Sequence, residues 1–133
     1  MAEVDARQLP ALARAVSDNA HAPFSRVRVG AAVLSEGGKV YTGCNVESAS
    51  YGLTQCAERN ALAAAVADGA LPGSLIAMAV YANGFAVLSP CGACRQVISE
   101  LMAPGAEVTS CCDNKESRTW TVAELLPYPF VLE

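Results

Sequence analysis

The sequence predicts an α/β fold built as a single domain of residues 1–133. A chain of this length is the size of one domain and is long enough to bury a hydrophobic core. Hydrophobic residues make up 53% of it and charged residues 17%, against about 25% charged residues in an average protein. Segments with helical spacing and segments with the alternation of strands also follow one another along the chain. We therefore expect helices packed on a sheet.

The first half of the chain predicts two helices on either side of a β-hairpin. Pro10 suits the first turn of a helix, so the first helix should begin near Gln8. Gly37 and Gly38 predict the hairpin turn. The second helix is almost entirely apolar beyond Asn60, so we expect it to be buried on every side. The expected elements are a helix at 8–20, a strand at 27–34, a turn at 36–39, a strand at 40–46, a polar loop at 47–55 and a helix at 57–67.

In the second half, glycine and proline mark the ends of the predicted elements. Gly69 should end the second helix, and the Asn83-Gly84 pair predicts a turn between two strands. Pro104 should stop the third helix. The expected elements are strands at 75–81 and 85–88, a helix at 94–102, strands at 107–111 and 118–122, and a short helix at 123–126.

Charge and hydropathy exclude several functional classes. Nine Lys and Arg residues against thirteen Asp and Glu give a formal net charge of −4, which disfavours a nucleic acid polymer as partner. The uncharged run of residues 69–94 is broken by turn residues before it reaches the roughly 20 apolar residues of a membrane helix. Residues 1–14 lack the apolar core of a secretory signal. We expect a cytoplasmic protein without membrane contact.

Two short stretches carry the chemistry: Cys56-Ala57-Glu58-Arg59 and Pro90-Cys91-Gly92-Ala93-Cys94. Thiolates are preferred zinc ligands, and three protein ligands leave a fourth position for a water molecule, whose pKa zinc lowers to about 7. Both stretches precede predicted helices, whose N-termini stabilise thiolates. Glu58 is close to a ligand but free to carry protons. This layout is similar to the signature of zinc deaminases, which would make Cys56, Cys91 and Cys94 the ligands and Glu58 the catalytic residue.

Three other interpretations of the cysteines remain open at this point. They could be inert core residues, since cysteine is often buried. The pair Cys91 and Cys94 alone could be a thiol-redox couple, although that would leave Glu58 unexplained. A non-catalytic structural zinc site would need a fourth ligand. The candidates for that ligand are His21, Cys44, Cys111 and Cys112.

Arg59 follows Glu58 directly and is the expected partner of a ligand thiolate. Three thiolates give zinc a nominal charge of −1, and hydrogen bonding from a cation draws electron density away from the sulfur. The alternative for Arg59 is an ordinary surface ion pair.

With these residues in place, the chain resembles the small zinc-dependent cytidine deaminases from about residue 22 to residue 130. The resemblance rests on both cysteine stretches and on three further sets of residues: 29–33 (Val-Gly-Ala-Ala-Val), 43–47 (Gly-Cys-Asn-Val-Glu), and Leu125-Leu126-Pro127 with Phe130. It implies a three-layer α/β/α sandwich with a mixed sheet of about five strands, assembled as a homotetramer. It also implies hydrolysis of cytidine and deoxycytidine to uridine and deoxyuridine in pyrimidine salvage, with Zn²⁺ as cofactor.

The resemblance also assigns substrate contacts. Asn45 and Glu47 lie two residues apart at a strand end, so their side chains face the same way, and the family uses them for the ribose. Backbone groups near Ala57 and Ser89 would bind the base, and Tyr51 lies in a second binding segment. Phe130 matches an aromatic that reaches into a neighbouring subunit's pocket.

One position departs from the family pattern. Val27 stands where the family commonly has a phenylalanine that packs on the nucleoside. A roomier pocket makes a bulkier cytosine nucleoside, such as blasticidin S, the alternative substrate.

Overall fold

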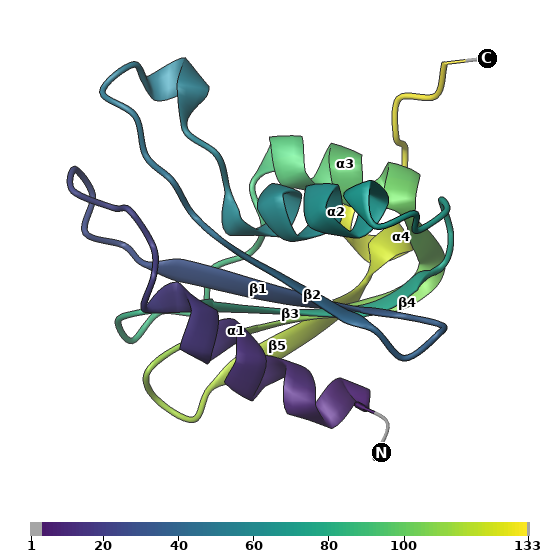
Figure 1. The fold of residues 1–133 in the computed structure, drawn as a ribbon, viewed down its shortest axis with the longest axis horizontal. Helices are drawn as coiled ribbons and strands as arrows, with labels where there is room; N and C mark the ends of the chain where they lie inside the picture. The colour runs from purple at the N-terminus through teal and green to yellow at the C-terminus, as the bar shows by residue number, and fades with distance from the viewer. Residues whose placement is uncertain (1–3, 133) are drawn as a thin grey trace.

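A five-stranded mixed sheet forms the middle layer of the structure (Figure 1). This computed structural model describes residues 4–132. In the sheet order β2-β1-β3-β4-β5, β1 pairs antiparallel with β2 and β3, β3 pairs parallel with β4, and β4 pairs antiparallel with β5. The strands are β1 (Val29–Ser35), β2 (Val40–Cys44), β3 (Leu75–Ala82), β4 (Met102–Cys111) and β5 (Ser117–Thr121).

Helices cover both faces of the sheet, with α1 on one side and α2, α3 and α4 on the other (Figure 1). The predicted α/β/α sandwich with a mixed sheet of five strands is therefore confirmed. The helices are α1 (Leu9–Ser17), α2 (Ala57–Ala67), α3 (Gly92–Leu101) and α4 (Val122–Leu125), with 3₁₀ turns η1 (Ala6–Gln8) and η2 (Tyr51–Leu53). Among residues 4–132, no helix combines the length and the hydrophobicity that crossing a membrane requires.

Side chains on the two faces of β1 pack in two separate hydrophobic cores. Ala32 and Leu34 pack with α1, while Ala31 and Val33 pack with α2 and α3, as the alternation of a strand requires. Gly43 of β2 allows α2 to lie directly on the sheet, because a Cβ there would be 2.5 Å from the Ala61 nitrogen. This close contact fixes the position of α2, and with it the position of the first cysteine stretch.

The predicted strand at residues 85–88 is wrong. Residues 83–90 form an irregular segment that leads into α3. The Asn83-Gly84 turn does form, but it is bound by a distant residue, since the Gly84 amide donates to Asp113 Oδ2 at 2.7 Å and the Asp113 amide donates to the Gly84 carbonyl at 2.8 Å. Asn114 Nδ2 likewise donates to the Phe85 carbonyl at 3.1 Å. These contacts replace the second arm of a hairpin.

Two further expectations need correction. Strand β4 begins at Met102, five residues before the predicted start at 107. Its register with β3 jumps from Leu75↔Met102 to Ala77↔Glu107, so residues 103–106 form a bulge that accommodates Pro104 within the strand. In addition, α2 is not buried on every side within one chain. Its outward face is exposed at Ala63, Ala64, Val66 and Ala67.

Candidate active site

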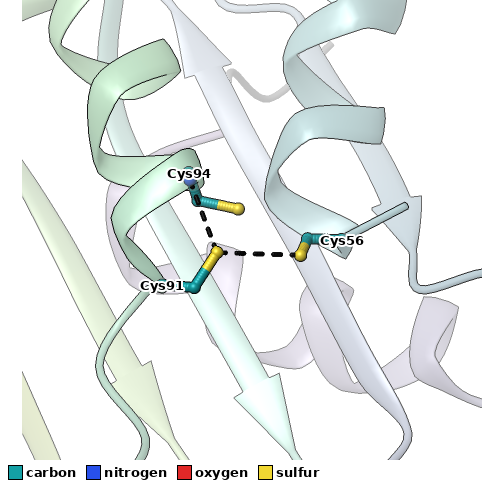
Figure 2. Close-up of side chains that lie close together, drawn as sticks. All are labelled: Cys56, Cys91 and Cys94. Carbon is teal, nitrogen blue, oxygen red and sulfur yellow. Dashed lines mark hydrogen bonds between the residues drawn. The ribbon is translucent and has the colours of Figure 1, made fainter. Parts of the chain in front are cut away.

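The N-termini of α2 and α3 bring the three predicted zinc ligands together. Cys56 is the N-cap of α2, Cys91 is the N-cap of α3, and Cys94 lies in the first turn of α3. Figure 2 shows their sulfurs pointing toward one another. All three Sγ atoms lie within 4.8 Å of one another, with 3.9 Å between those of Cys56 and Cys91. Tetrahedral ligands at a Zn–S distance of about 2.3 Å would stand about 3.8 Å apart, so the trio fits zinc.

The surroundings of the trio favour a negatively charged sulfur at Cys56. Arg59 Nη2 donates to Cys56 Sγ at 3.3 Å, and the Cys94 amide donates to Cys91 Sγ at 3.5 Å. Hydrogen bonding from the Cys94 thiol, together with the Arg59 guanidinium, lowers the pKa of Cys56 to about 5. The same hydrogen bond with Cys56, together with burial, raises the pKa of the Cys94 thiol. Zinc binds thiolates rather than thiols, so the Cys94 proton would have to leave when the three cysteines bind the metal.

No fourth protein ligand joins the three cysteines in the part of the chain that the structure describes. The candidates His21, Cys44, Cys111 and Cys112 lie outside the cluster. These residues therefore do not form a closed structural site with four protein ligands. The fourth coordination position of a bound zinc ion would be left for a small molecule.

Glu58 is buried beside the trio, with 5% of its surface exposed. It lies in the first turn of α2 and lines a cavity together with Cys56 and Cys91. Burial raises the pKa of the Glu58 carboxyl above its usual range. A carboxyl group with a raised pKa takes up and releases protons more readily near neutral pH, as general acid–base catalysis requires.

The cavity has a volume of about 160 Å³ and lies between the sheet and the two helix N-termini. Side chains of β1, β3 and β4 line it from the sheet: Val29, Val80, Ala82 and Ser110. From the helix side it is lined by Ala57, Glu58 and Cys91, and by Leu88, Ser89 and Pro90 before α3. An apolar cavity with a few polar groups is typical of a small-molecule site.

Asn45 lines the cavity, but most of its amide is already engaged. Its Oδ1 accepts from the Val29 amide and its Nδ2 donates to the Val27 carbonyl, both at 2.8 Å. One N–H of the side chain is left for a ligand. Val27 itself is held by this contact and is not among the described residues that line the cavity.

Glu47 lies beside the cavity and not in it. Its Oε1 accepts from the amides of Phe24 and Ser25 at 3.0 and 3.2 Å, and Ser25 Oγ donates to Oε2 at 2.5 Å. The hydrogen bond from Ser25 holds the pKa of Glu47 below its usual value. Glu47 and Tyr51 line a separate depression, which shares Thr54 with the cavity.

Two predicted contacts do not reach the cavity within one chain. Tyr51 is 81% exposed in η2, and Phe130 is 70% exposed beside α3, where Gln96 Nε2 donates to its carbonyl at 3.0 Å. The sequence interpretation also missed Ser110. The only signal for it was a polar residue two positions from Val108, on the inward face of a strand.

Comparisons with known proteins agree with this geometry. The family model of the cytidine and deoxycytidylate deaminase zinc-binding region matches residues 4–109. The chain is 42% identical to the cytidine deaminase of Sporosarcina psychrophila over 98% of this chain and 94% of that protein. It is 44% identical to the cytidine deaminase of Halalkalibacterium halodurans over 87% and 86%.

A solved structure has the same fold at full length. The cytidine deaminase of Burkholderia pseudomallei superposes with a TM-score of 0.91 at 44% identity, and the match covers 96% of this chain and all of that one. The thiol trio, the buried carboxylate and these matches lead to one conclusion. The chain belongs to the family of zinc-binding cytidine and deoxycytidylate deaminases.

Proposed function

We propose that this protein hydrolyses cytidine and deoxycytidine to uridine and deoxyuridine and releases ammonia. The observation that carries the proposal is that Glu58 and two members of the three-thiol cluster, Cys56 and Cys91, line the same apolar cavity. Relatives with 42% and 44% identity are cytidine deaminases, which favours cytidine over blasticidin S. The net charge of −4 argues against a polynucleotide substrate.

The reaction follows from the positions of the side chains. Cys56, Cys91 and Cys94 would hold zinc, which when bound supplies a water molecule of lowered pKa as the nucleophile. Glu58 takes a proton from this water and delivers it to ring N3, which makes C4 electrophilic. The oxygen bonds to C4, and Glu58 then carries the remaining hydroxyl proton to the amino group. The C4–N4 bond breaks and ammonia leaves.

Other residues bind and orient the nucleoside in this proposal. The free N–H of Asn45 and the Glu47 carboxylate bind the sugar hydroxyls, and backbone groups of Ala57 and Ser89 bind the polar edge of the base. All except Glu47 line the cavity, and Glu47 lies next to it. Arg59 offsets the negative charge of the sulfurs through its contact with Cys56.

We further propose that the domain of residues 1–133 works as a homotetramer. The apolar face of α2 is uncovered in one chain, and Val131 and Leu132 are 69% and 86% exposed near the C-terminus. Large exposed apolar surfaces mark protein interfaces. Tyr51 and Phe130, which miss the cavity of their own chain, are available to complete that of a neighbour. Light scattering at micromolar concentration should give the mass of four chains, and a monomer would contradict the proposal.

The cytoplasm and pyrimidine salvage are the proposed setting. The structure gives free thiols for all six cysteines, and exposed thiols persist in a reducing compartment.

Replacing Glu58 by alanine tests the proposed reaction against a non-catalytic zinc module and a thiol-redox module. Loss of the proton carrier should lower kcat for cytidine by at least about 100-fold. Glu58→Gln, which keeps the shape of the side chain, should lose as much, and zinc content measured by atomic absorption should stay near one ion per chain. Wild-type protein that holds zinc but deaminates neither cytidine nor deoxycytidine would refute the proposed function.

A further inference from the structure

Ser110 is an unusual residue in the cavity. Its side chain is 1% exposed, and in residues 4–132 its Oγ is the single buried side-chain oxygen without a hydrogen-bond partner. Burying an unpaired hydroxyl is costly. A serine kept at such a position therefore calls for a partner that the protein itself does not supply.

The strand geometry directs Ser110 into the cavity. Alternation along β4 places it on the same face as Val108, which packs in the core on the side of the sheet that α2, α3 and α4 cover. The register pairs it with Val80 of β3, and both residues line the cavity that contains Glu58. The residue that carries the unpaired hydroxyl therefore lines the same cavity as Glu58, where the proposed reaction takes place.

The strand order separates Ser110 and Asn45 across this cavity. Asn45 is bound through its side chain to Val29 at the start of β1, whereas Ser110 is on β4. β3 lies between these strands, so a spacing of about 4.8 Å per strand separates the two ends by roughly 10 Å. In a cytosine nucleoside, N1 with its sugar and C4 with its amino group also lie at opposite ends of the ring. A sugar bound near Asn45 directs the amino group toward Ser110.

We infer that Ser110 contacts the amino group that leaves the substrate and limits which substituents that nitrogen can carry. The inference rests on the proposed deamination. A hydroxyl suits both stages of the reaction because it can accept and donate. It accepts an N–H of the planar amino group, and it donates to the nitrogen lone pair that appears once C4 is tetrahedral. Ser110 transfers no proton, since Glu58 performs that step.

The test compares Ser110→Ala with a second buried serine. Ser17 is 3% exposed, but its Oγ donates to the Arg14 carbonyl at 2.6 Å, and it lies on α1, away from the cavity. Ser110→Ala should raise Tm, because an unpaired hydroxyl is removed, and should lower kcat/KM for cytidine by about 3- to 10-fold, the value of one hydrogen bond. Ser17→Ala should lower Tm and leave kcat/KM unchanged.

The substrate N4-methylcytidine, which releases methylamine, tests whether Ser110 contacts the amino nitrogen, because its extra methyl group is attached to that nitrogen. Ser110→Ala opens space near the nitrogen, so the ratio of kcat/KM for N4-methylcytidine to that for cytidine should rise. Ser110→Val fills this space, and the ratio should fall. Both ratios are measured by absorbance on zinc-loaded protein.

Three results would overturn the inference. Unchanged cytidine turnover in Ser110→Ala would make the serine merely structural. A loss of turnover with the same substrate ratio in both variants would mean that Ser110 does not lie at the amino end. Zinc-loaded wild-type protein without activity on cytidine would refute the proposed function and, with it, the role of Ser110. This outcome is seen in the wild type alone, so it can be told apart from a failure of the Ser110 inference.

Discussion

Replacing Gly43 by alanine should displace α2 and thereby lower the activity, although Gly43 does not line the cavity. The added Cβ would lie 2.5 Å from the Ala61 nitrogen and 2.7 Å from the Ala57 carbonyl oxygen, both in the backbone of α2. Ordinary contact begins near 3.4 Å, so α2 would have to move away from β2 by about 0.9 Å. Overpacking of this kind costs about 1–3 kcal/mol of stability.

The same displacement reaches Cys56 and Glu58, because both lie at the N-terminal end of α2. A misplacement of about 1 Å at a catalytic group can cost on the order of 100-fold in rate. We therefore expect kcat/KM for cytidine to fall by about 100-fold in Gly43→Ala and the affinity for zinc to weaken. The assay is the loss of ultraviolet absorbance of cytidine, measured on protein whose folded fraction is known from thermal melting.

Two glycines provide controls for this variant. Gly37 lies in the β1–β2 turn, where a Cβ would meet nothing closer than Ser35 Oγ at 3.8 Å, so Gly37→Ala should change neither activity nor Tm. Gly30 faces α1, and its Cβ would be 1.8 Å from the Ala13 carbonyl oxygen. Gly30→Ala should destabilise strongly but leave the folded fraction its zinc. Full activity in a destabilised Gly43→Ala variant would refute the idea that this contact positions the site.

Three further predictions follow from the contacts around the site and the sheet. Arg59→Ala removes the donor to Cys56 Sγ and should lower kcat by roughly 10-fold while zinc stays bound. Arg59→Lys keeps only the charge, so its kcat should be intermediate. Unchanged turnover in the zinc-loaded Arg59→Ala variant would exclude this role. Hydrogen bonds from the Tyr81 hydroxyl and the Gly84 amide, together with the nearby Arg14 guanidinium, hold the pKa of Asp113 below its usual value. The stability from Asp113 is therefore present above about pH 4 and is lost as pH falls through the lower folded-state pKa. Asp113→Asn should lower Tm at pH 7 and flatten its decline below pH 4, and parallel Tm–pH curves would contradict this. Removal of zinc with a chelator should abolish turnover, and added zinc should restore it; turnover that survives metal removal would count against a zinc-dependent reaction.

The sequence was most informative where local chemistry decides the structure. Helix-forming residues predicted helices beginning at 57 and 94. The first begins there, with Cys56 as N-cap, whereas α3 begins two residues before its predicted start, at Gly92, with Cys91 as N-cap. Spacing alone then identified Cys94 as the third member of the trio. These features depend on neighbours within a few residues, so they can be read without knowing the fold.

Features that depend on distant residues could not be read in this way. Asn83-Gly84 predicted a hairpin, but Asp113, 29 residues further along the chain, binds the turn instead. Pro104 predicted a break, whereas pairing with β3 allows a bulge. The role of Ser110 can be inferred only once the fold pairs it with Val80 of β3 and places both residues in the lining of the cavity that contains Glu58. The Asn45 side chain was expected to be free for a sugar, and only the structure shows how much of it binds residues 27–29.

The central claim is that Glu58 and the three-cysteine site together deaminate a cytosine nucleoside. The most direct measurement is the ultraviolet absorbance of cytidine after mixing with protein loaded with one zinc ion per chain. We expect the absorbance of cytidine to fall as uridine and ammonia appear in equal amounts, with no such change for Glu58→Ala holding the same zinc. Equal rates for the two proteins, or unchanged cytidine with the wild type, would contradict the claim.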